Sequence, residues 1–198
     1  MKRPALLALI VLGCSFASVR ADEGPTLQSQ GGAGEGVEAS LGCYDQFRSG
    51  DMKAAVSLCT RAIMSGELTG DDLIGAYINR GVAFRNLGEY QRAVNDYTAA
   101  LKYAPNDAMI YANRANARRE LGELKKALAD ADHAIAIDAT RPASFYTRGA
   151  VLEAAGQYDK ARKDYIMAVT LAPKNMDYQN AMLLLDDKIA REPKTKRY

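Results

Sequence analysis

The chain has 198 residues, of which 48% are hydrophobic and 25% charged, and its formal net charge is +2. Residues 1–21 carry Lys2, Arg3 and Arg20 but no acid, so without them 23 of the 26 bases remain against 24 acids. A near-neutral chain of mixed charge is typical of a soluble folded protein. It argues against a nucleic-acid partner, which requires a clustered basic face.

Residues 1–21 predict an export signal. The basic start Met1–Arg3 precedes an apolar run over residues 4–12, and Val19 and Ala21 supply small residues for cleavage. The apolar run is too short to be a spanning helix, which needs about 20 residues. We therefore expect an exported bacterial protein that begins after Ala21 and is periplasmic or secreted.

A second interpretation of this segment remains open. The sequence Val11-Leu12-Gly13-Cys14 resembles the box at which bacterial lipoproteins are cut and acylated. Acylation at Cys14 would anchor the protein to a membrane, although Leu12 is bulkier than is usual in that box.

Residues 22–36 are predicted to be a disordered linker. They contain five glycines and almost no apolar side chains, so burial cannot offset the entropy lost on ordering.

Residues 37–73 are predicted to be a degenerate first repeat with a short insertion at residues 66–73. Its turn at Gly50 repeats the turn at Gly88 in the next unit, but its first helix lacks an aromatic residue found in the later units. Terminal repeats are commonly atypical because one face has no neighbour. Asp71 or Asp72 is predicted to cap the following helix.

Residues 74–175 contain one pattern three times, in units 74–107, 108–141 and 142–175. Each unit has an aromatic residue in its fourth place, a small residue in its eighth, a turn glycine and then two alanines. These residues are Tyr77, Gly81, Gly88, Ala93 and Ala100; Tyr111, Ala115, Gly122, Ala127 and Ala134; and Phe145, Gly149, Gly156, Ala161 and Ala168. The constant period of 34 residues predicts a helical solenoid.

Residues 176–191 are predicted to form a single capping helix. Tyr178, Met182, Leu185 and Ile189 lie on one stripe at helical spacing, which suits the apolar end of the last hairpin. Residues 192–198 are predicted to be a solvated basic tail.

The three units resemble the tetratricopeptide repeat in their aromatic, small, alanine and proline positions, over about residues 36–175. The resemblance implies an all-α fold, a right-handed superhelical solenoid of helix-turn-helix repeats. It also implies a concave groove that holds a peptide or a protein segment. A bare spacer is the alternative.

The resemblance further implies which side chains face the groove. They are Ile78, Asn79, Val82, Arg85, Met109, Asn113, Asn116, Arg119, Tyr146, Thr147 and Glu153. The asparagines are expected to be exposed and to bind the backbone of an extended peptide. The family's lysine clamp for a C-terminal carboxylate is not supported, because its places hold Ser40, Ile78, Met109 and Ala143.

Arginine and aspartate recur together in each unit, 16 residues apart. The pairs are Arg80 and Asp96, Arg114 and Asp130, and Arg148 and Asp164. The degenerate repeat lacks both, having Leu41 or Gly42 in one place and Leu58 in the other. This matched presence and absence predicts a partly buried Arg–Asp bridge between the helices of each hairpin.

Two cysteines of the expected mature chain, Cys43 and Cys59, bracket the turn at Gly50. An antiparallel hairpin would place them opposite each other, so a disulfide is predicted for an oxidising compartment. Two buried free thiols are the alternative. Two thiols and the distant His133 do not suggest a metal site.

No catalytic triad, phosphate-binding loop or zinc motif is recognisable in the sequence. We therefore expect a protein that is not an enzyme and has neither a cofactor nor a small-molecule substrate. The predicted function is a protein–protein interaction scaffold, an adaptor or assembly factor of the cell envelope. The alternative is a lipid-anchored structural spacer in an outer-membrane complex.

Overall fold

The computed structural model describes residues 34–191, which form nine α-helices and no strands. The helices are α1 (Glu35–Ser49), α2 (Met52–Met64), α3 (Gly70–Asn86), α4 (Tyr90–Tyr103), α5 (Ala108–Glu120), α6 (Leu124–Ile137), α7 (Pro142–Ala154), α8 (Tyr158–Leu171) and α9 (Met176–Arg191). The predicted export signal, Cys14, nearly all of the predicted linker and the basic tail lie outside the described residues. No helix within residues 34–191 is long and apolar enough to cross a bilayer.

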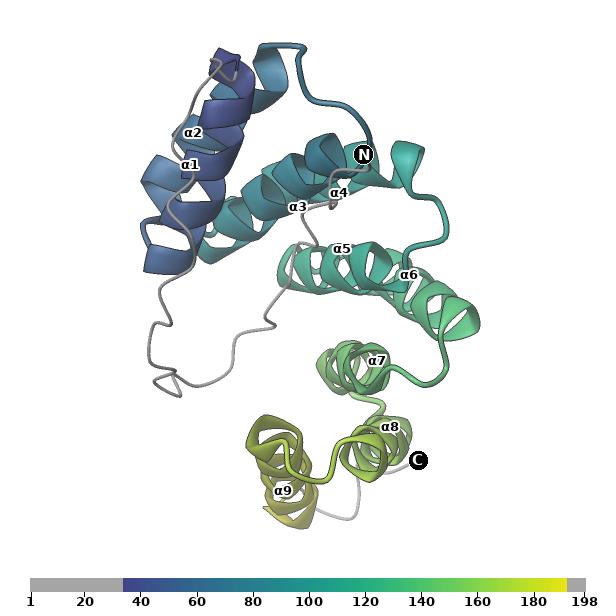
Figure 1. Ribbon diagram of the computed structural model, residues 1–198. Coiled ribbons are helices and arrows are strands. Elements are labelled where there is room, and N and C mark those ends of the chain that lie inside the picture. The colour runs from purple at the N-terminus through teal and green to yellow at the C-terminus, as the bar shows by residue number, and fades with distance from the viewer. Residues whose placement is uncertain (1–33, 192–198) are drawn as a thin grey trace.

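Successive helices pack as four antiparallel hairpins, α1–α2, α3–α4, α5–α6 and α7–α8, and α9 packs on the last of them. Figure 1 shows the hairpins following one another from the purple α1 to the yellow α9 in one elongated stack. Helices α5, α7 and α9 begin where the second unit, the third unit and the capping helix were predicted to begin. The all-α repeat solenoid expected from the sequence is therefore confirmed.

Each hairpin turns at a glycine with a left-handed backbone. Gly88 has a φ of 78°, and the next residue, Glu89, donates its backbone N–H to the carbonyl of Phe84 over 2.8 Å. This bond satisfies one of the carbonyls left open at the end of α3. The equivalent glycines of the other hairpins also have positive φ values.

The N-terminal boundaries differ from the prediction in two places. Helix α1 begins at Glu35, inside the predicted linker, because Gly36 is buried and donates its N–H to a Glu67 carboxylate oxygen over 2.9 Å. Helix α3 begins at Gly70, so the predicted cap at Asp71 or Asp72 is wrong. These two acids instead lie in the first turn of α3, where negative charge favours the helix dipole.

In the first, second and fourth hairpins a close contact joins two places that are 16 residues apart. In the second hairpin Gly81 lies against the fully buried ring of Tyr97, and a Cβ on Gly81 would be 2.8 Å from that ring. The corresponding places of the first hairpin hold Cys43 and Cys59, which form a buried disulfide with a Cα–Cα distance of 4.9 Å. The predicted disulfide therefore replaces a glycine–tyrosine contact.

Consecutive first helices also contact one another, as α1 with α3, α3 with α5, and α5 with α7. Consecutive second helices make no comparable contact in the described part of the chain. The first helices therefore lie on the inner, concave side of the stack. Helix α9 continues their row, since the ring of Tyr178 lies 5.0 Å from the ring of Tyr146 on α7.

Candidate functional site

The structure places the predicted groove residues in two different environments. Arg85, Met109, Arg119, Tyr146 and Glu153 are partly exposed. Ile78, Asn79, Val82, Asn113, Asn116 and Thr147 are buried. Their expected exposure in the groove is therefore wrong. The reason is the direct packing of consecutive first helices, which covers the sides of α3, α5 and α7 that face along the stack.

The asparagines illustrate this correction. Asn113 is only 2% exposed, and Asn116 uses its side-chain amide to donate a 3.2 Å hydrogen bond to the Thr147 hydroxyl. That bond joins α5 to α7 and stabilises the stack. The structure therefore gives Asn116 a packing role, in place of the predicted bond to a peptide backbone.

An open pocket of about 340 Å³ lies on the concave side, between α5, α7 and α9. Asn116 and Arg119 line it from α5, Tyr146 and Glu153 from α7, and Leu184 from α9. Four of these five residues were among the predicted groove residues. The structure thus brings together the C-terminal members of the predicted set, while Ile78, Val82 and Arg85 lie on α3 outside this pocket.

The polar wall of the pocket centres on Glu153. Its carboxylate accepts hydrogen bonds from the Tyr165 hydroxyl over 2.9 Å and from the Lys188 ammonium over 3.1 Å. Burial, followed by the charge of Glu153, raises the pKa of Tyr165 well above its usual value. The hydrogen bond to Glu153 likewise raises the pKa of Lys188. Lys188 thus neutralises Glu153, while Arg119, the second cation of the pocket, pairs with Glu120, its neighbour on α5.

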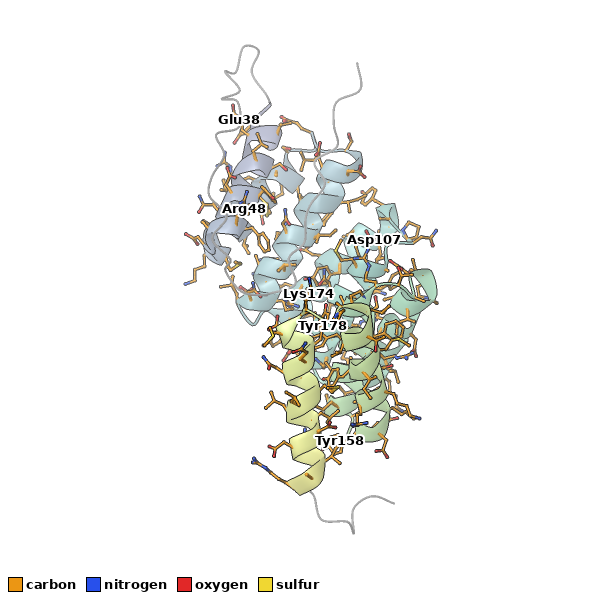
Figure 2. The ribbon with its side chains drawn as sticks, turned by 60° about the horizontal axis from the view of Figure 1, so that its bottom comes forward. Glu38, Arg48, Asp107, Tyr158, Lys174 and Tyr178 are labelled. Atoms are coloured by element: carbon orange, nitrogen blue, oxygen red, sulfur yellow. A yellow bond between two sulfur atoms is a disulfide. The ribbon has the colours of Figure 1, made fainter. Side chains whose placement is uncertain are left out.

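The apolar wall comes from an aromatic group and from α9. Tyr146 packs between Tyr165, at a ring distance of 5.7 Å, and Tyr178. Leu184 is 71% exposed at the edge of the pocket. Figure 2 shows α9 beside the α7–α8 hairpin, with Tyr178 near its start and Tyr158 of α8 near its far end. The pocket therefore combines a partly buried tyrosine, an exposed leucine and two cations.

Sequence reasoning missed Leu184 and Lys188, because α9 was assigned only to capping, and it also missed Tyr165 on α8. One signal was available. Three leucines stand together in residues 183–185, and Leu185, which is fully buried, is the one of the three that belongs to the packing stripe. Leu184 therefore had no place in the packing stripe.

Comparison with known proteins supports the repeat assignment. Residues 75–107 and residues 142–175 each match a family model described as the tetratricopeptide repeat. The tetratricopeptide repeat domain of OM64 from Arabidopsis is 30% identical, over 58% of this chain and 94% of that domain, with a TM-score of 0.53. The chain belongs to the tetratricopeptide repeat family.

Other solved members of the fold are also similar. The first tetratricopeptide repeat domain of Spaghetti (RPAP3), bound to the HSP90 peptide SRMEEVD, is 25% identical, over 59% of this chain and 93% of that chain, with a TM-score of 0.54. MamA from Desulfovibrio magneticus RS-1 is 20% identical, over 80% of this chain and 87% of that chain, with a TM-score of 0.66, and supports the fold alone. No curated protein sequence matches the chain.

The predicted Arg–Asp pairs of the three tetratricopeptide repeats lie in contact. Arg80 donates two hydrogen bonds to Asp96, over 2.8 and 2.7 Å, and the other two pairs have the same bidentate geometry. Each arginine also bonds to the preceding hairpin, through Thr60, Thr98 or Asp132. These arginines therefore join both the helices of one repeat and neighbouring repeats, which leaves them little capacity to bind a ligand.

The first hairpin replaces this polar contact with an apolar one. Gly42 occupies the place of the arginine, since a Cβ added there would lie 3.1 Å from the side chain of Leu58, which stands where the later repeats have aspartate. Thr60 is nevertheless retained and accepts a hydrogen bond from Arg80. The structure thus resolves the choice between Leu41 and Gly42.

The remaining candidate for chemistry is His133. Its side chain is exposed, and its ring centroid lies 4.4 Å from that of Tyr111. Residues 34–191 contain no cluster of three or more His, Cys, Asp or Glu side chains arranged to hold a metal ion. His133 therefore has a packing contact and no arrangement of ligands around it.

Proposed function

We propose that this tetratricopeptide repeat protein is a non-catalytic scaffold that binds a segment of a partner protein in its concave groove. The observation that carries the proposal is the open pocket between α5, α7 and α9, where Leu184 is exposed beside Arg119 and Tyr146. An exposed apolar side chain next to an arginine and a tyrosine is the composition found at the centre of protein interfaces.

The RPAP3 domain supports a peptide as the ligand, because it was solved with a peptide bound. The ligand chemistry here would differ from a lysine-clamped C-terminal carboxylate. Two of the places that such a clamp requires hold Ile78 and Ala143, which are apolar and buried. We expect instead an apolar side chain on Tyr146 and Leu184, with an acidic group near Arg119.

We place this scaffold in the bacterial cell envelope, as a periplasmic adaptor or assembly factor. The signal-like residues 1–21 support export, and the Cys43–Cys59 disulfide suits an oxidising compartment. The box ending at Cys14 favours a second candidate, a lipid-anchored spacer in an outer-membrane complex. Mass measurement of the N-terminus of protein from the native cells separates them. A chain beginning at Asp22 supports the adaptor, and an acylated Cys14 supports the anchored spacer.

Site-specific photocrosslinking in the native cells tests the groove. A photoreactive residue at Leu184 or Ala150, which both line the pocket, should give a defined adduct with a partner. The matched control is Ser57, an exposed residue of the second helix α2 on the other side of the stack. Adducts from Ser57 but not from Leu184 would contradict groove binding.

A further inference from the structure

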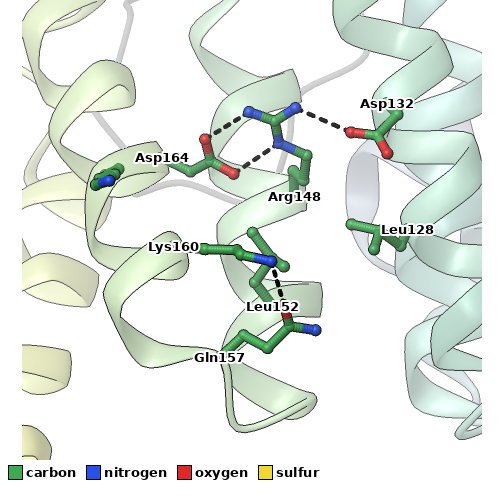
Figure 3. A pocket seen from close by; sticks show the side chains of 8 residues that line it. Leu128, Asp132, Arg148, Leu152, Gln157, Lys160 and Asp164 are labelled. Carbon is green, nitrogen blue, oxygen red and sulfur yellow. Dashed lines mark hydrogen bonds and ion pairs between the residues drawn. The ribbon is translucent and has the colours of Figure 1, made fainter.

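A second hollow lies among α6, α7 and α8, on the side of the second helices (Figure 3). Its volume is about 380 Å³, within the range of small-ligand sites. Leu128 from α6 and Leu152 from α7 supply its apolar lining, and Arg148, Lys160 and Lys163 supply its cations. It is separate from the concave pocket, with which it shares no lining residue.

The side chain beside this hollow differs among the three repeats when their sequences are aligned. The place of Leu152 is held by Phe84 in the first full repeat and by Arg118 in the second. The guanidinium of Arg92 covers Phe84 at 3.9 Å from the ring centroid. Arg118 fills its own space by bonding to Asp130 over 2.7 Å. Leu152 is shorter than either of these side chains, and the hollow lies beside it.

The same comparison shows that a cation in the third repeat has lost its acidic partner. The two earlier repeats have an ion pair at this turn, Glu89 with Arg92 and Glu123 with Lys126. In the third repeat the acid is replaced by Gln157, whose side-chain oxygen accepts a 2.9 Å hydrogen bond from Lys160. A neutral amide can accept that bond but does not cancel the charge of Lys160.

The other charges of the hollow cancel those of its two lysines only in part. Its two carboxylates, Asp132 and Asp164, both bond to Arg148, as the dashed lines in Figure 3 show. This trio carries one net negative charge. Lys160 and Lys163, which lie three residues apart on α8, add two positive charges, so the hollow keeps one net positive charge.

We propose that this hollow binds an aspartate or glutamate side chain of a partner protein, with a neighbouring apolar side chain seated on Leu128 and Leu152. The carboxylate pairs with Lys160 and Lys163, where it replaces the acid that the earlier repeats carry within their own chain. The third repeat is thus specialised for an acidic contact on the outer face. This site is independent of the concave groove and does not require a ligand there.

Nuclear magnetic resonance titration of the ¹⁵N-labelled protein, purified from expressing cells, tests the site. The probe is the blocked dipeptide acetyl-Glu-Leu-amide, compared with acetyl-Gln-Leu-amide and with inorganic phosphate. The glutamate peptide should shift the amide signals of Leu128, Lys160 and Lys163. It should bind about threefold or more tightly than the glutamine peptide, the effect expected for one exposed charge pair.

Two variants test whether the missing acid at residue 157 leaves Lys160 available to a ligand. Gln157→Glu restores the acid of the earlier repeats and should weaken binding of the glutamate peptide by about threefold or more, because Lys160 becomes neutralised. Lys126→Gln is the control. It removes the equivalent cation of the second repeat, outside the hollow, and should leave binding unchanged while the remaining spectrum reports an intact fold. Equal binding of both peptides, no response to Gln157→Glu, or tighter binding of phosphate than of the glutamate peptide would overturn the proposal.

Discussion

The Arg–Asp bridges allow a quantitative test of burial, and the Arg80–Asp96 pair is the cleanest of the three. Its two hydrogen bonds measure 2.8 and 2.7 Å, and the side chains are only 15% and 7% exposed. Asp130, in contrast, is shared between Arg114 and Arg118. Replacing Asp96 by alanine leaves the Arg80 charge in a largely desolvated place without its carboxylate. We expect a loss of about 3 kcal/mol in unfolding free energy.

A double-mutant cycle isolates the bridge itself. Arg80→Ala, Asp96→Ala and the double variant should give a coupling energy of at least about 1.5 kcal/mol in urea denaturation, since hydrogen bonds to charged groups contribute about that much or more. The apolar double variant Arg80→Met with Asp96→Leu should be more stable than either single alanine variant. The first hairpin already carries an apolar contact at these places, between Gly42 and Leu58.

The matched control is the exposed ion pair of Arg61 and Glu35. Its oxygen–nitrogen distance is 2.8 Å, close to that of the buried pair, but its side chains are 56% and 77% exposed. Solvent screening should reduce its coupling to below about 1 kcal/mol. If the effects of the Arg80 and Asp96 variants are additive, or if both pairs couple equally, then burial does not set the strength of these bridges.

Three further predictions concern the hairpin interiors. Reducing the Cys43–Cys59 bond, which closes 16 residues, should remove about 3 kcal/mol and speed hydrogen exchange in α1 and α2 before the later repeats, and uniform exchange would contradict this. Gly81→Ala should destabilise the protein by about 1–3 kcal/mol in chemical denaturation, because the new Cβ would meet the fully buried Tyr97 ring at 2.8 Å; an unchanged midpoint would show that the helices can separate. The Tyr97 hydroxyl has no hydrogen-bond partner among the described residues, and burial raises its pKa. Above about pH 10 the unfolded chain therefore releases a proton that the folded chain retains, so stability falls as pH rises, and Tyr97→Phe should make that fall shallower in denaturation curves measured from pH 8 to 11. Identical pH profiles for the two proteins would refute this assignment.

The burial of the groove asparagines could not be predicted from the sequence of a single repeat. Asn113 and Asn116 are polar residues on first helices, and their place in the family pattern suggested exposure to a ligand. Whether a side chain there meets solvent or the next helix depends on how closely α5 and α7 approach each other. That distance is set by residues of both helices, so neither repeat specifies it alone.

The sequence by itself determined the repeating hairpin, its turns and its internal pairs. Glycines with left-handed backbones end helices locally, and residues 16 apart meet whenever two helices fold back around a short turn. These features depend on chain geometry within one unit. The 34-residue period and the joint presence or absence of arginine and aspartate in the repeats were therefore sufficient to predict them. Only the tertiary structure decided which surfaces remain open. The concave pocket draws Arg119 and Tyr146 from two repeats and Leu184 from the capping helix, and the outer hollow lies beside Leu152 in a space bounded by α6 and α8. Both depend on the stacking of units and on the volume of side chains across their junctions, which no repeat encodes separately.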